Sequence, residues 1–421
     1  MEEIIRFLNH WWREGKVRKN LALEFKRESF FRARDLLKKR QILVIHGLRR
    51  VGKSTLIYQL IQYLIRKRTN PKKILYFSFD KKTSEIKNIL DIYSEITEID
   101  YERESVFVFL DEVYKLEGWH KELKLLYDAL PNIKFVVSGS ASLKIEKEAR
   151  SALAGRVFYL EMKPLSFKEF FELKFGKKPE NIKTWENKLR RVFPSFVRKP
   201  FPEIVNFSEE EVMEYINEMV IDKLIFSDFS KTFENINPGL LQNLTELFFS
   251  NPGMYLNIES LSKSLRKSKN DLLFHIKLLE MGYIISIVKN YRGSYISGSR
   301  KMRRVYPYHP ALIQGLFKEI DESKLIECFV RSLLDAKFYW RENGKEVDFV
   351  VDGKPVEVKY KNSISNADLK NLLQFMEKFC VKKGYIISKN VFKNIKENKK
   401  QISVIPAWYL AVRGWENEIL H

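Results

Sequence analysis

Two glycines, a lysine and two hydroxyl residues stand near the N-terminus at a spacing that can hold a triphosphate. Residues 47–55 read Gly-Leu-Arg-Arg-Val-Gly-Lys-Ser-Thr and contain Gly-x4-Gly-Lys-Ser, the pattern of a phosphate-binding loop, or P-loop. In such a loop backbone N–H groups face the phosphates, the lysine reaches the β- and γ-phosphates, and the serine hydroxyl binds Mg2+. The predicted ATP·Mg2+ site consists of Gly47, Leu48, Arg49, Arg50, Val51, Gly52, Lys53, Ser54 and Thr55.

The elements on either side of this loop are the ones that its chemistry requires. Residues 42–45 form a short, apolar, β-branched run that predicts a buried parallel strand. Residues 56–65 have the apolar spacing of a helix, whose N-terminus would direct its positive dipole end at the phosphates. The alternative, a chance turn rich in glycine and lysine, does not account for a strand directly before it and a helix directly after it.

A strand that ends in two carboxylates supplies the other half of an ATP-hydrolysing site. Residues 106–112 read Val-Phe-Val-Phe-Leu-Asp-Glu, an apolar strand that ends in two acids, as in a Walker B motif. Asp111 would hold Mg2+ through water, together with Ser54. Glu112 would orient and activate the attacking water. The pair therefore predicts hydrolysis as well as binding.

Three further polar residues are candidates for the same site. Ser138 and Ser140 follow the apolar run 133–137, at the strand end where ligands bind in open α/β sheets. Either could sense the γ-phosphate, and a helix cap is an equally good interpretation of both. Arg156, in a short basic turn, could contact phosphates in a neighbouring subunit as an arginine finger. Pairing of Arg156 with a local acid is the alternative.

The hydrophobic pattern divides residues 1–235 into three segments. Residues 41–160 alternate strands and helices, which predicts an α/β fold with a parallel sheet. Residues 1–40 predict helices in which Trp11 and Trp12 pack onto the next domain, in preference to stacking on nucleic-acid bases. Residues 161–235 predict amphipathic helices, over 166–174 and 209–225, separated by a basic, proline-rich loop around 194–202.

Residues 236–310 predict a helix–turn–helix followed by a basic hairpin. This is the layout of a winged helix, in which the second helix of the motif enters the major groove of DNA and the wing contacts phosphates. Winged helices also bind proteins, but basic residues cluster on both of these elements and favour DNA. The predicted DNA contacts are Lys267, Lys269, Arg292, Arg300, Lys301, Arg303 and Arg304.

Four charged residues in 311–421 fit the pattern of a metal-dependent nuclease. Asp348 and Glu357 lie on two strands joined by a turn, so their carboxylates can share a divalent ion. Lys359 points to the same face as Glu357, and the three match the Asp…Glu-x-Lys of PD-(D/E)xK nucleases. Glu327, on a preceding helix, would be an additional ligand or would hold one of the other ligands in place. The pattern is degenerate, so cleavage, scaffolding and binding all stay open.

Together these motifs resemble those of the prokaryotic AAA+-type ATPases of the archaeal-ATPase and DUF4143 group. The residues that carry the resemblance are Gly47-Leu-Arg-Arg-Val-Gly-Lys-Ser-Thr, Leu110-Asp-Glu, Val137-Ser-Gly-Ser, Leu153-Ala-Gly-Arg and Pro164-Leu-Ser-Phe-Lys-Glu-Phe. It covers nearly the whole chain and implies that Ser138 or Ser140 holds the sensor position and that Arg156 is the finger. The domains implied are an N-terminal helical segment at 1–40, a P-loop ATPase core at 41–160, a helical lid at 161–235, a winged helix at 236–310 and a restriction-endonuclease-like α/β domain at 311–421.

Composition adds the class of partner. The chain has 421 residues and a formal net charge of +21, an excess that favours a polyanionic partner over a merely lysine-rich surface. Its two cysteines argue for a reducing cytoplasm and against a disulfide framework. The N-terminus lacks a secretory signal, and no apolar run is long enough to insert into a membrane.

The sequence therefore predicts a cytoplasmic AAA+-type ATPase with ATP and Mg2+ as cofactors. Its expected partner is double-stranded or structured DNA, in repair, recombination or mobile-element processes, with subunits that oligomerise. Two alternatives stay open: an ATP-gated, metal-dependent DNA nuclease, and a signalling ATPase whose C-terminal modules bind a protein.

Overall fold

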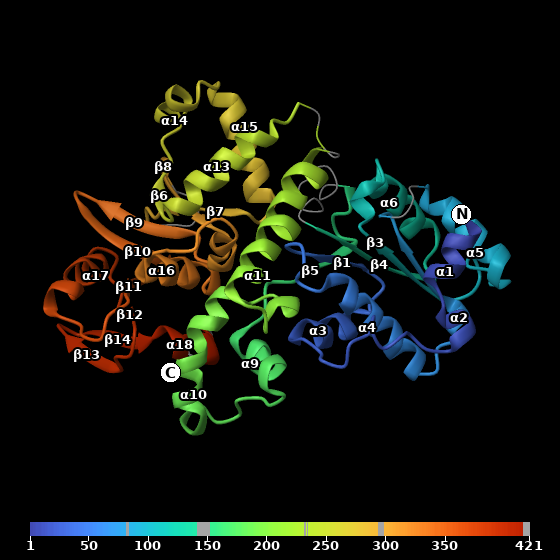
Figure 1. The fold of residues 1–421 in the computed structure, drawn as a ribbon, viewed down its shortest axis with the longest axis horizontal. Coiled ribbons are helices and arrows are strands. Elements are labelled where there is room, and N and C mark those ends of the chain that lie inside the picture. Colours follow the sequence, from blue (N-terminus) through green and yellow to red (C-terminus); the bar gives the residue numbers. More distant parts are fainter. Residues whose placement is uncertain (81–83, 141–151, 231–232, 234, 294–298, 416–421) are drawn as a thin grey trace. The chain divides into compact units, whose positions relative to one another are not determined.

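The chain folds around two separate β-sheets. The computed structural model describes the chain except residues 81–83, 141–151, 231–232, 234, 294–298 and 416–421, and the side chains of 299–301. It divides into Met1–Leu165, here called unit 1, and Ser166–His421, here called unit 2. Each unit contains one of the sheets (Figure 1).

Unit 1 is built on a five-stranded sheet in which every neighbouring pair is parallel, in the order β2-β3-β4-β1-β5. The strands are β1 (Ile42–His46), β2 (Ile74–Ser78), β3 (Val106–Asp111), β4 (Ile133–Gly139) and β5 (Val157–Glu161). Strands β1, β2 and β4 are buried along their whole length, as expected for a parallel sheet that is covered on both faces. Since parallel strands end at the same edge, the predicted Walker B strand β3 ends beside β4, which in turn lies beside the P-loop strand β1. The predicted α/β fold of this region is confirmed.

The helices of unit 1 follow the predicted alternation. They are α1 (Glu2–Leu8), α2 (Trp11–Glu14), α3 (Glu28–Leu36), α4 (Lys53–Arg66), α5 (Ile86–Thr97) and α6 (Trp119–Ala129), with short 3-10 turns η1 (Pro71–Lys73) and η2 (Val113–Lys115). Helix α4 begins at Lys53, so the P-loop lysine itself occupies the first helical position. The loop therefore ends at the N-terminus of α4, which is the arrangement that phosphate binding needs.

The N-terminal residues complete the edge of this sheet. Trp11 is fully buried, and the indole N–H groups of Trp11 and Trp12 both donate to the carbonyl oxygen of Ile74 in β2, at 3.2 and 2.9 Å. The Asn9 side chain accepts from the Tyr76 N–H at 2.7 Å and donates to the Tyr76 carbonyl oxygen at 2.8 Å. The predicted packing of the two tryptophans onto the ATPase core is confirmed.

Unit 2 contains a nine-stranded mixed sheet in the order β13-β14-β12-β11-β10-β9-β7-β8-β6. Its strands are β6 (Met254–Tyr255), β7 (Ile285–Asn290), β8 (Ser299–Pro307), β9 (Phe338–Glu342), β10 (Lys345–Val351), β11 (Lys354–Lys359), β12 (Lys383–Ser388), β13 (Lys393–Glu397) and β14 (Lys400–Pro406). The predicted wing hairpin, β7 and β8, joins the predicted nuclease-like strands because β7 pairs in parallel with β9. The sheet thus runs across the domain boundary expected at residue 310, and the two segments belong to one unit.

Only some helices of unit 2 were predicted from the sequence. They are α9 (Phe167–Phe175), α10 (Ile182–Arg198), α11 (Glu209–Glu214), the π-helical η4 (Tyr215–Phe229), α13 (Pro238–Ser250), α14 (Ile258–Leu265), α15 (Lys269–Met281), α16 (Glu322–Leu333), α17 (Asn366–Lys378) and α18 (Ala407–Arg413), with 3-10 turns η3 (Pro202–Ile204) and η5 (Pro310–Gly315). Helices α10, α17 and α18 were not predicted. Helices α13, α14 and α15, followed by the strands β7 and β8, have the order predicted for residues 236–310, and the short strand β6 was not predicted.

The sequence predicts a loop around 194–202, but helix α10 continues through Pro194 to Arg198. Proline removes one helical hydrogen bond and normally ends or kinks a helix. Here the aromatic packing on either side of it prevails. Phe196 stacks on Phe167 with ring centroids 4.7 Å apart, and both Phe193 and Phe196 contact Phe329 edge-on. The prediction of a loop was therefore wrong at residues 194–198.

Two expectations from composition can be compared with the structure. Cys328 is buried, Cys380 is exposed, and neither forms a disulfide. Within the described ranges, the structure has no helix with the length and apolar character to cross a membrane.

Candidate nucleotide-hydrolysis site

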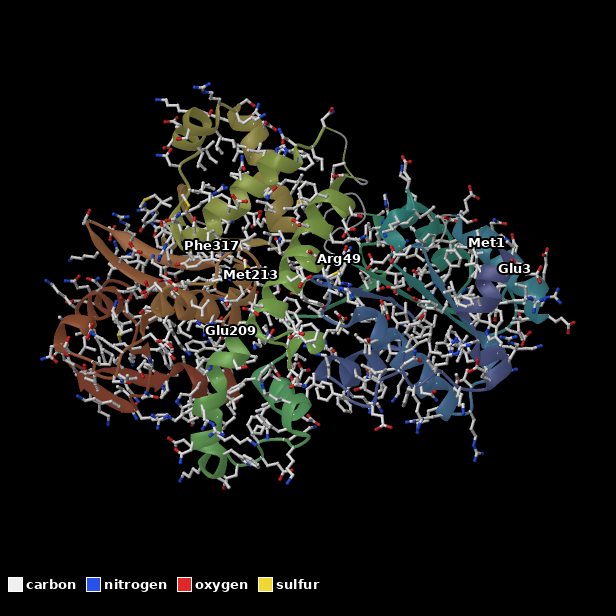
Figure 2. The ribbon with its side chains drawn as sticks, in the orientation of Figure 1. Met1, Glu3, Arg49, Glu209, Met213 and Phe317 are labelled. Carbon is white, nitrogen blue, oxygen red and sulfur yellow. The ribbon has the colours of Figure 1, made fainter. Side chains whose placement is uncertain are left out.

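The backbone of the P-loop can only be formed by the glycines that the sequence places there. Gly47 has φ +146°, and a Cβ at this position would collide with the carbonyl oxygen of Met162. Gly52 has φ +94° and leads directly into α4. Arg49, labelled in Figure 2, lies on the loop between them. The close approach of Gly47 to Met162 holds the loop against the segment after β5, so its curl is fixed by unit 1 itself.

Lys53 lies inside the loop. Its side chain is only 6% exposed, and its ammonium group donates to the carbonyl oxygens of Gly47 and Leu48, each at 3.1 Å. The positive charge is thus held within the loop, which in other P-loop proteins surrounds the β- and γ-phosphates.

Three hydroxyl groups of the site hydrogen-bond to the Asp111 carboxylate. This carboxylate is 3% exposed, and its Oδ2 accepts hydrogen bonds from the Ser54 hydroxyl at 2.7 Å and the Tyr76 hydroxyl at 3.1 Å. The Ser138 hydroxyl donates to its Oδ1. The four residues come from α4, β2, β3 and β4. The structure therefore brings the predicted Ser54, Asp111 and Ser138 together.

The same oxygens fit a magnesium ion. Mg2+ prefers oxygen ligands, and in nucleotide sites it binds one or two protein oxygens and takes its other positions from phosphates and water. Ser54 and Asp111 offer a hydroxyl and a carboxylate in direct contact. Both would hold the ion, which would neutralise developing charge on the phosphates.

Glu112 follows Asp111 in a left-handed backbone conformation, with φ +53°. Its carboxylate Oε2 accepts the backbone N–H of Ser140 at 3.3 Å, and the Ser140 hydroxyl donates to the Tyr114 hydroxyl at 3.1 Å. Burial raises the pKa of Glu112 above its ordinary value, while Lys53 acts in the opposite direction. Of the two sensor candidates, Ser138 thus contacts Asp111, and Ser140 positions Glu112.

Arg156 is engaged with a local acid. Its Nε and Nη2 donate to Oδ1 and Oδ2 of Asp128 in α6, at 2.8 and 3.0 Å. This two-pronged pair is the alternative that the sequence left open for Arg156. Its role as an arginine finger stays a prediction.

Tyr76 is a member of the site that the sequence did not indicate. It lies within β2, in an apolar run that reads as a buried strand, and nothing local distinguishes its hydroxyl from that of any core tyrosine. The register of β2 on β3 pairs Ser78 with Asp111, so Tyr76, two residues earlier, lies on the same face of the sheet. Only a known strand order would have revealed it.

We expect Tyr76→Phe to lower the affinity for Mg2+, so that turnover needs a higher Mg2+ concentration, without unfolding the protein. Groups that hydrogen-bond to a metal-binding side chain orient it, and their loss typically costs about 10–100-fold in metal affinity. The measurement is ATP turnover against Mg2+ concentration. Tyr93→Phe is the matched control, because it removes a hydroxyl that bonds to the Lys72 carbonyl oxygen instead. An equal Mg2+ requirement in both variants would contradict the positioning role.

The predicted nuclease residues also come together, but around an arginine. Glu327 of α16 and Asp348 of β10 lie near Arg304 of β8, whereas Glu357 of β11 lies beside Asp348 and pairs with Lys359 at 2.7 Å. Burial, with the nearby Glu357 and Glu327, raises the pKa of Asp348 well above its ordinary value. Arg304 was predicted to contact DNA. That prediction was wrong, because Arg304 is only 7% exposed and is paired with carboxylates in the interior.

The other predicted DNA contacts differ in their surroundings. Lys269 begins α15, is exposed and pairs with Glu259 at 3.0 Å, whereas Lys267 is half-buried in the turn before it. Arg292 is exposed after β7, and Arg303 is half-buried in β8. The side chains of Arg300 and Lys301 lie outside the described residues.

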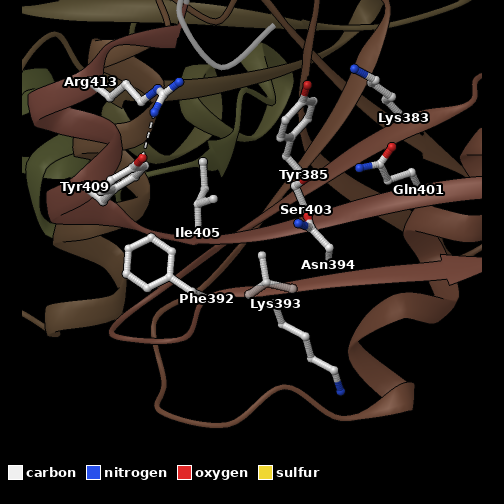
Figure 3. A pocket seen from close by; sticks show the side chains of 11 residues that line it. Lys383, Tyr385, Phe392, Lys393, Asn394, Gln401, Ser403, Ile405, Tyr409 and Arg413 are labelled. Atoms are coloured by element: carbon white, nitrogen blue, oxygen red, sulfur yellow. Dashed lines mark hydrogen bonds between the residues drawn. The ribbon is translucent and has the colours of Figure 1, made fainter. Parts of the chain in front are cut away.

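Basic and aromatic side chains also line a cavity of about 400 Å3 in unit 2, at β12, β13, β14 and α18 (Figure 3). Lys383, Lys393 and Arg413 line it together with Tyr385 and Tyr409. Arg413 donates to the Tyr409 hydroxyl at 2.9 Å. The cavity lies within the lysine-rich C-terminal segment.

Comparison with known families divides the chain into three matched segments. Residues 39–171 match an AAA domain family, residues 197–323 match a domain of unknown function, DUF8612, and residues 326–410 match another, DUF4143. The first match agrees with the P-loop and strand order described above. The chain therefore contains an AAA-type P-loop ATPase domain, and the DUF4143 match supports the family resemblance in its C-terminal part.

Relatives and solved structures are more distant. An uncharacterized protein of Methanocaldococcus jannaschii, MJ1637, is 25% identical over 89% of this chain and 82% of its own length. An uncharacterized Haemophilus influenzae protein is 26% identical over 59% of this chain and 62% of its own. Among solved structures, the Walker-type ATPase PABY2304 of Pyrococcus abyssi covers 71% of this chain and 97% of its own, at 14% identity and a TM-score of 0.45. A DNA replication initiation factor covers 61% of this chain and 86% of its own, at 14% identity and a TM-score of 0.29. Neither score establishes a shared overall fold.

Proposed function

We propose that the protein hydrolyses ATP with Mg2+ in unit 1 and uses the nucleotide cycle to act on DNA through unit 2. The observation that carries the first part is the convergence of Lys53, Ser54, Asp111, Glu112 and Ser138 at the carboxyl ends of β1, β3 and β4. A bare P-loop pattern would only support nucleotide binding. A second carboxylate, held one residue beyond Asp111, supports turnover as well.

In this proposal each side chain has one task. Lys53 binds the β- and γ-phosphates and compensates their charge. Ser54 and Asp111 hold the metal ion, while Tyr76 and Ser138 keep the Asp111 carboxylate in place. Glu112 accepts the proton of the attacking water, and the Ser140 N–H orients the Glu112 carboxylate.

The raised pKa of Glu112 predicts the pH dependence of turnover. A general base acts only when deprotonated, so kcat falls as the pH is lowered through the pKa of Glu112. Because burial raises this pKa above the ordinary 4.5, the fall begins at a higher pH than for an exposed glutamate. The test is kcat from about pH 8 down to about pH 4.5, with ATP affinity at each pH as the control. A flat profile across this range, at constant affinity, would contradict the role of Glu112 as base.

The proposal that unit 2 acts on DNA rests on charge and on the order of its elements. The net charge of the chain is +21. The succession α13, β6, α14, α15, β7, β8 supports a winged helix, with α15 as the helix that would enter the major groove. Lys267, Lys269, Arg292 and Arg303 are the described residues that we propose contact phosphates. We also propose that residues 161–235 form a helical lid and that the subunits oligomerise.

Binding of a protein is the second candidate function, and one observation favours it. Helix α15 presents Leu273 and Phe274, which are 42% and 40% exposed, and Lys269 on the same helix is paired with Glu259. Apolar side chains on an exposed helix are more typical of a protein interface than of a DNA groove.

DNA binding measured against salt separates the two. For a DNA-binding protein, affinity falls steeply between about 50 and 200 mM salt, and each lost phosphate contact lowers the slope of log K against log salt by about 1. We expect Lys267→Glu with Arg292→Glu to weaken binding of a duplex and to flatten this slope. Lys370→Glu, an exposed charge reversal on α17, is the control. Weak binding at about 0.15 M salt with no strong salt dependence would favour the protein partner.

A further inference from the structure

The Arg304 guanidinium lies at the centre of the carboxylate cluster in unit 2. Its Nη2 is 2.8 Å from Glu327 Oε1 and its Nη1 is 3.0 Å from Glu346 Oε1 and 3.9 Å from Asp348 Oδ1. Its Nε donates to the carbonyl oxygen of Gly253 at 2.8 Å. One buried cation thus connects β8 to α16, to β10 and to the loop before β6.

Aromatic rings enclose the same group. The carbon of the guanidinium lies 5.1, 5.7 and 5.9 Å from the ring centroids of Tyr306, Tyr339 and Tyr255. A guanidinium is weakly hydrated and favours this combination of ring faces and carboxylates, whereas a divalent ion needs oxygen ligands around it. The walls of the cluster therefore suit an arginine.

The carboxylates that would bind a metal are each engaged with protein donors. Glu327 Oε1 also accepts from the Tyr306 hydroxyl at 2.6 Å. Asp348 Oδ2 accepts the backbone N–H of Val358 at 2.8 Å. Glu357 accepts from the Lys359 ammonium through Oε1, at 2.7 Å, and from the Asp348 N–H through Oε2, at 3.3 Å.

These bonds direct the two central carboxylates at backbone N–H groups instead of at a common point. A divalent ion would have to displace the N–H donors and the two neighbouring cations. Among the residues that the structure describes, no set of three or more His, Cys, Asp and Glu side chains is arranged to hold a metal ion. The residues of this cluster therefore do not fit the metal that the Asp…Glu-x-Lys pattern implies.

We propose that Arg304 is the permanent cation of this cluster and that, with Lys359 on Glu357, it supplies the positive charge that a divalent metal supplies in a nuclease of this pattern. The cluster is then a structural clamp that ties the wing strand β8 to the nuclease-like strands, and the nuclease-like region does not cut DNA. This inference concerns only unit 2. It holds whether or not unit 1 hydrolyses ATP and whichever partner unit 2 binds.

A clamp also explains why the wing and the nuclease-like strands share one sheet. Breaking a buried ion pair by removing one partner leaves uncompensated charge and is strongly destabilising. The wing therefore cannot separate from β9 and β10 while Arg304 bridges Glu327 and Glu346. Any movement of the helix–turn–helix must carry the nuclease-like strands with it.

The first test is binding of Mn2+ to the full-length protein without nucleotide, measured by isothermal titration calorimetry. We expect wild type and Glu357→Gln to bind the same number of ions, and any site they share to disappear in Asp111→Asn, which would assign it to unit 1. A site present in wild type and lost in Glu357→Gln would overturn the proposal. So would Mn2+-dependent cutting of DNA that Glu357→Gln abolishes.

The second test examines the clamp with conservative variants. Arg304→Lys keeps the charge, but the single nitrogen of a lysine cannot replace the separate bonds that Nη2, Nη1 and Nε make to Glu327, Glu346 and the Gly253 carbonyl oxygen. We expect it to lower the Tm of unit 2 by about 10 °C, from the cost of a broken buried pair and the Tm scale of a unit this size. Arg303→Lys, the adjacent substitution in β8, is the control. A Tm change in Arg304→Lys no larger than in the control would overturn the clamp.

Discussion

Lys53→Ala should leave the protein folded but unable to bind ATP at concentrations that saturate the wild type. The variant removes the only side-chain ammonium held inside the described P-loop, 3.1 Å from the Gly47 and Leu48 carbonyl oxygens. The loss of one such charge-stabilising donor lowers kcat by about 10²–10³-fold in other enzymes. Here the ground state loses its phosphate contact as well, so both binding and turnover should fall. Equilibrium binding of a fluorescent ATP analogue and steady-state hydrolysis measure the two effects.

The control for this variant is Lys67→Ala, an exposed lysine at the other end of the same helix. It removes an equal charge from α4 and should bind and hydrolyse ATP as the wild type does. Normal turnover in Lys53→Ala would show that the P-loop of unit 1 is not the site of hydrolysis. A circular dichroism spectrum of each variant confirms that loss of activity is not loss of fold.

Glu112→Gln should separate binding from chemistry. Glutamine keeps the size of the side chain and its contact with the Ser140 N–H, but it cannot accept a proton from water. We expect ATP affinity to stay near that of the wild type and kcat to fall by about 10²–10⁴-fold, the usual contribution of a general base. Single-turnover hydrolysis and equilibrium binding are the measurements.

The exposed Glu117, in the loop after Walker B, provides the matched control as Glu117→Gln. If Glu112→Gln turned over ATP at the wild-type rate, another group would have to activate the water, and the assignment of Glu112 would be wrong. A loss of affinity with unchanged kcat would instead place Glu112 among the binding residues.

The nucleotide site could be predicted largely from the sequence because its chemistry is local. Gly47 to Thr55 form one continuous loop and helix start, and the strand that ends in Asp111 and Glu112 has a pattern of its own. The contact of Tyr76 with Asp111 could not be predicted, since it depends on the register of two strands about thirty residues apart.

Unit 2 shows the opposite case, in which local pattern misleads. Arg304 follows other basic residues in the sequence, and this basic run is typical of a wing that contacts phosphates. Its actual partners, Glu327 and Glu346, are distant in sequence and reach it only because β7 and β8 continue the sheet of β9 and β10. Pro194 reads as a helix breaker, yet Phe193 and Phe196 stabilise the helix through packing against Phe167 and Phe329. In both places, long-range packing outweighs the local signal.

Steady-state ATP hydrolysis with and without duplex, forked and single-stranded DNA, beside Lys53→Ala, tests the central claim most directly. We expect turnover that depends on Lys53 and is stimulated by at least one form of DNA, because the basic elements of unit 2 would then communicate with the site in unit 1. Turnover equal in wild type and Lys53→Ala would contradict the assignment of the site. Lys53-dependent turnover that is indifferent to every DNA would contradict the action on DNA and favour a protein partner.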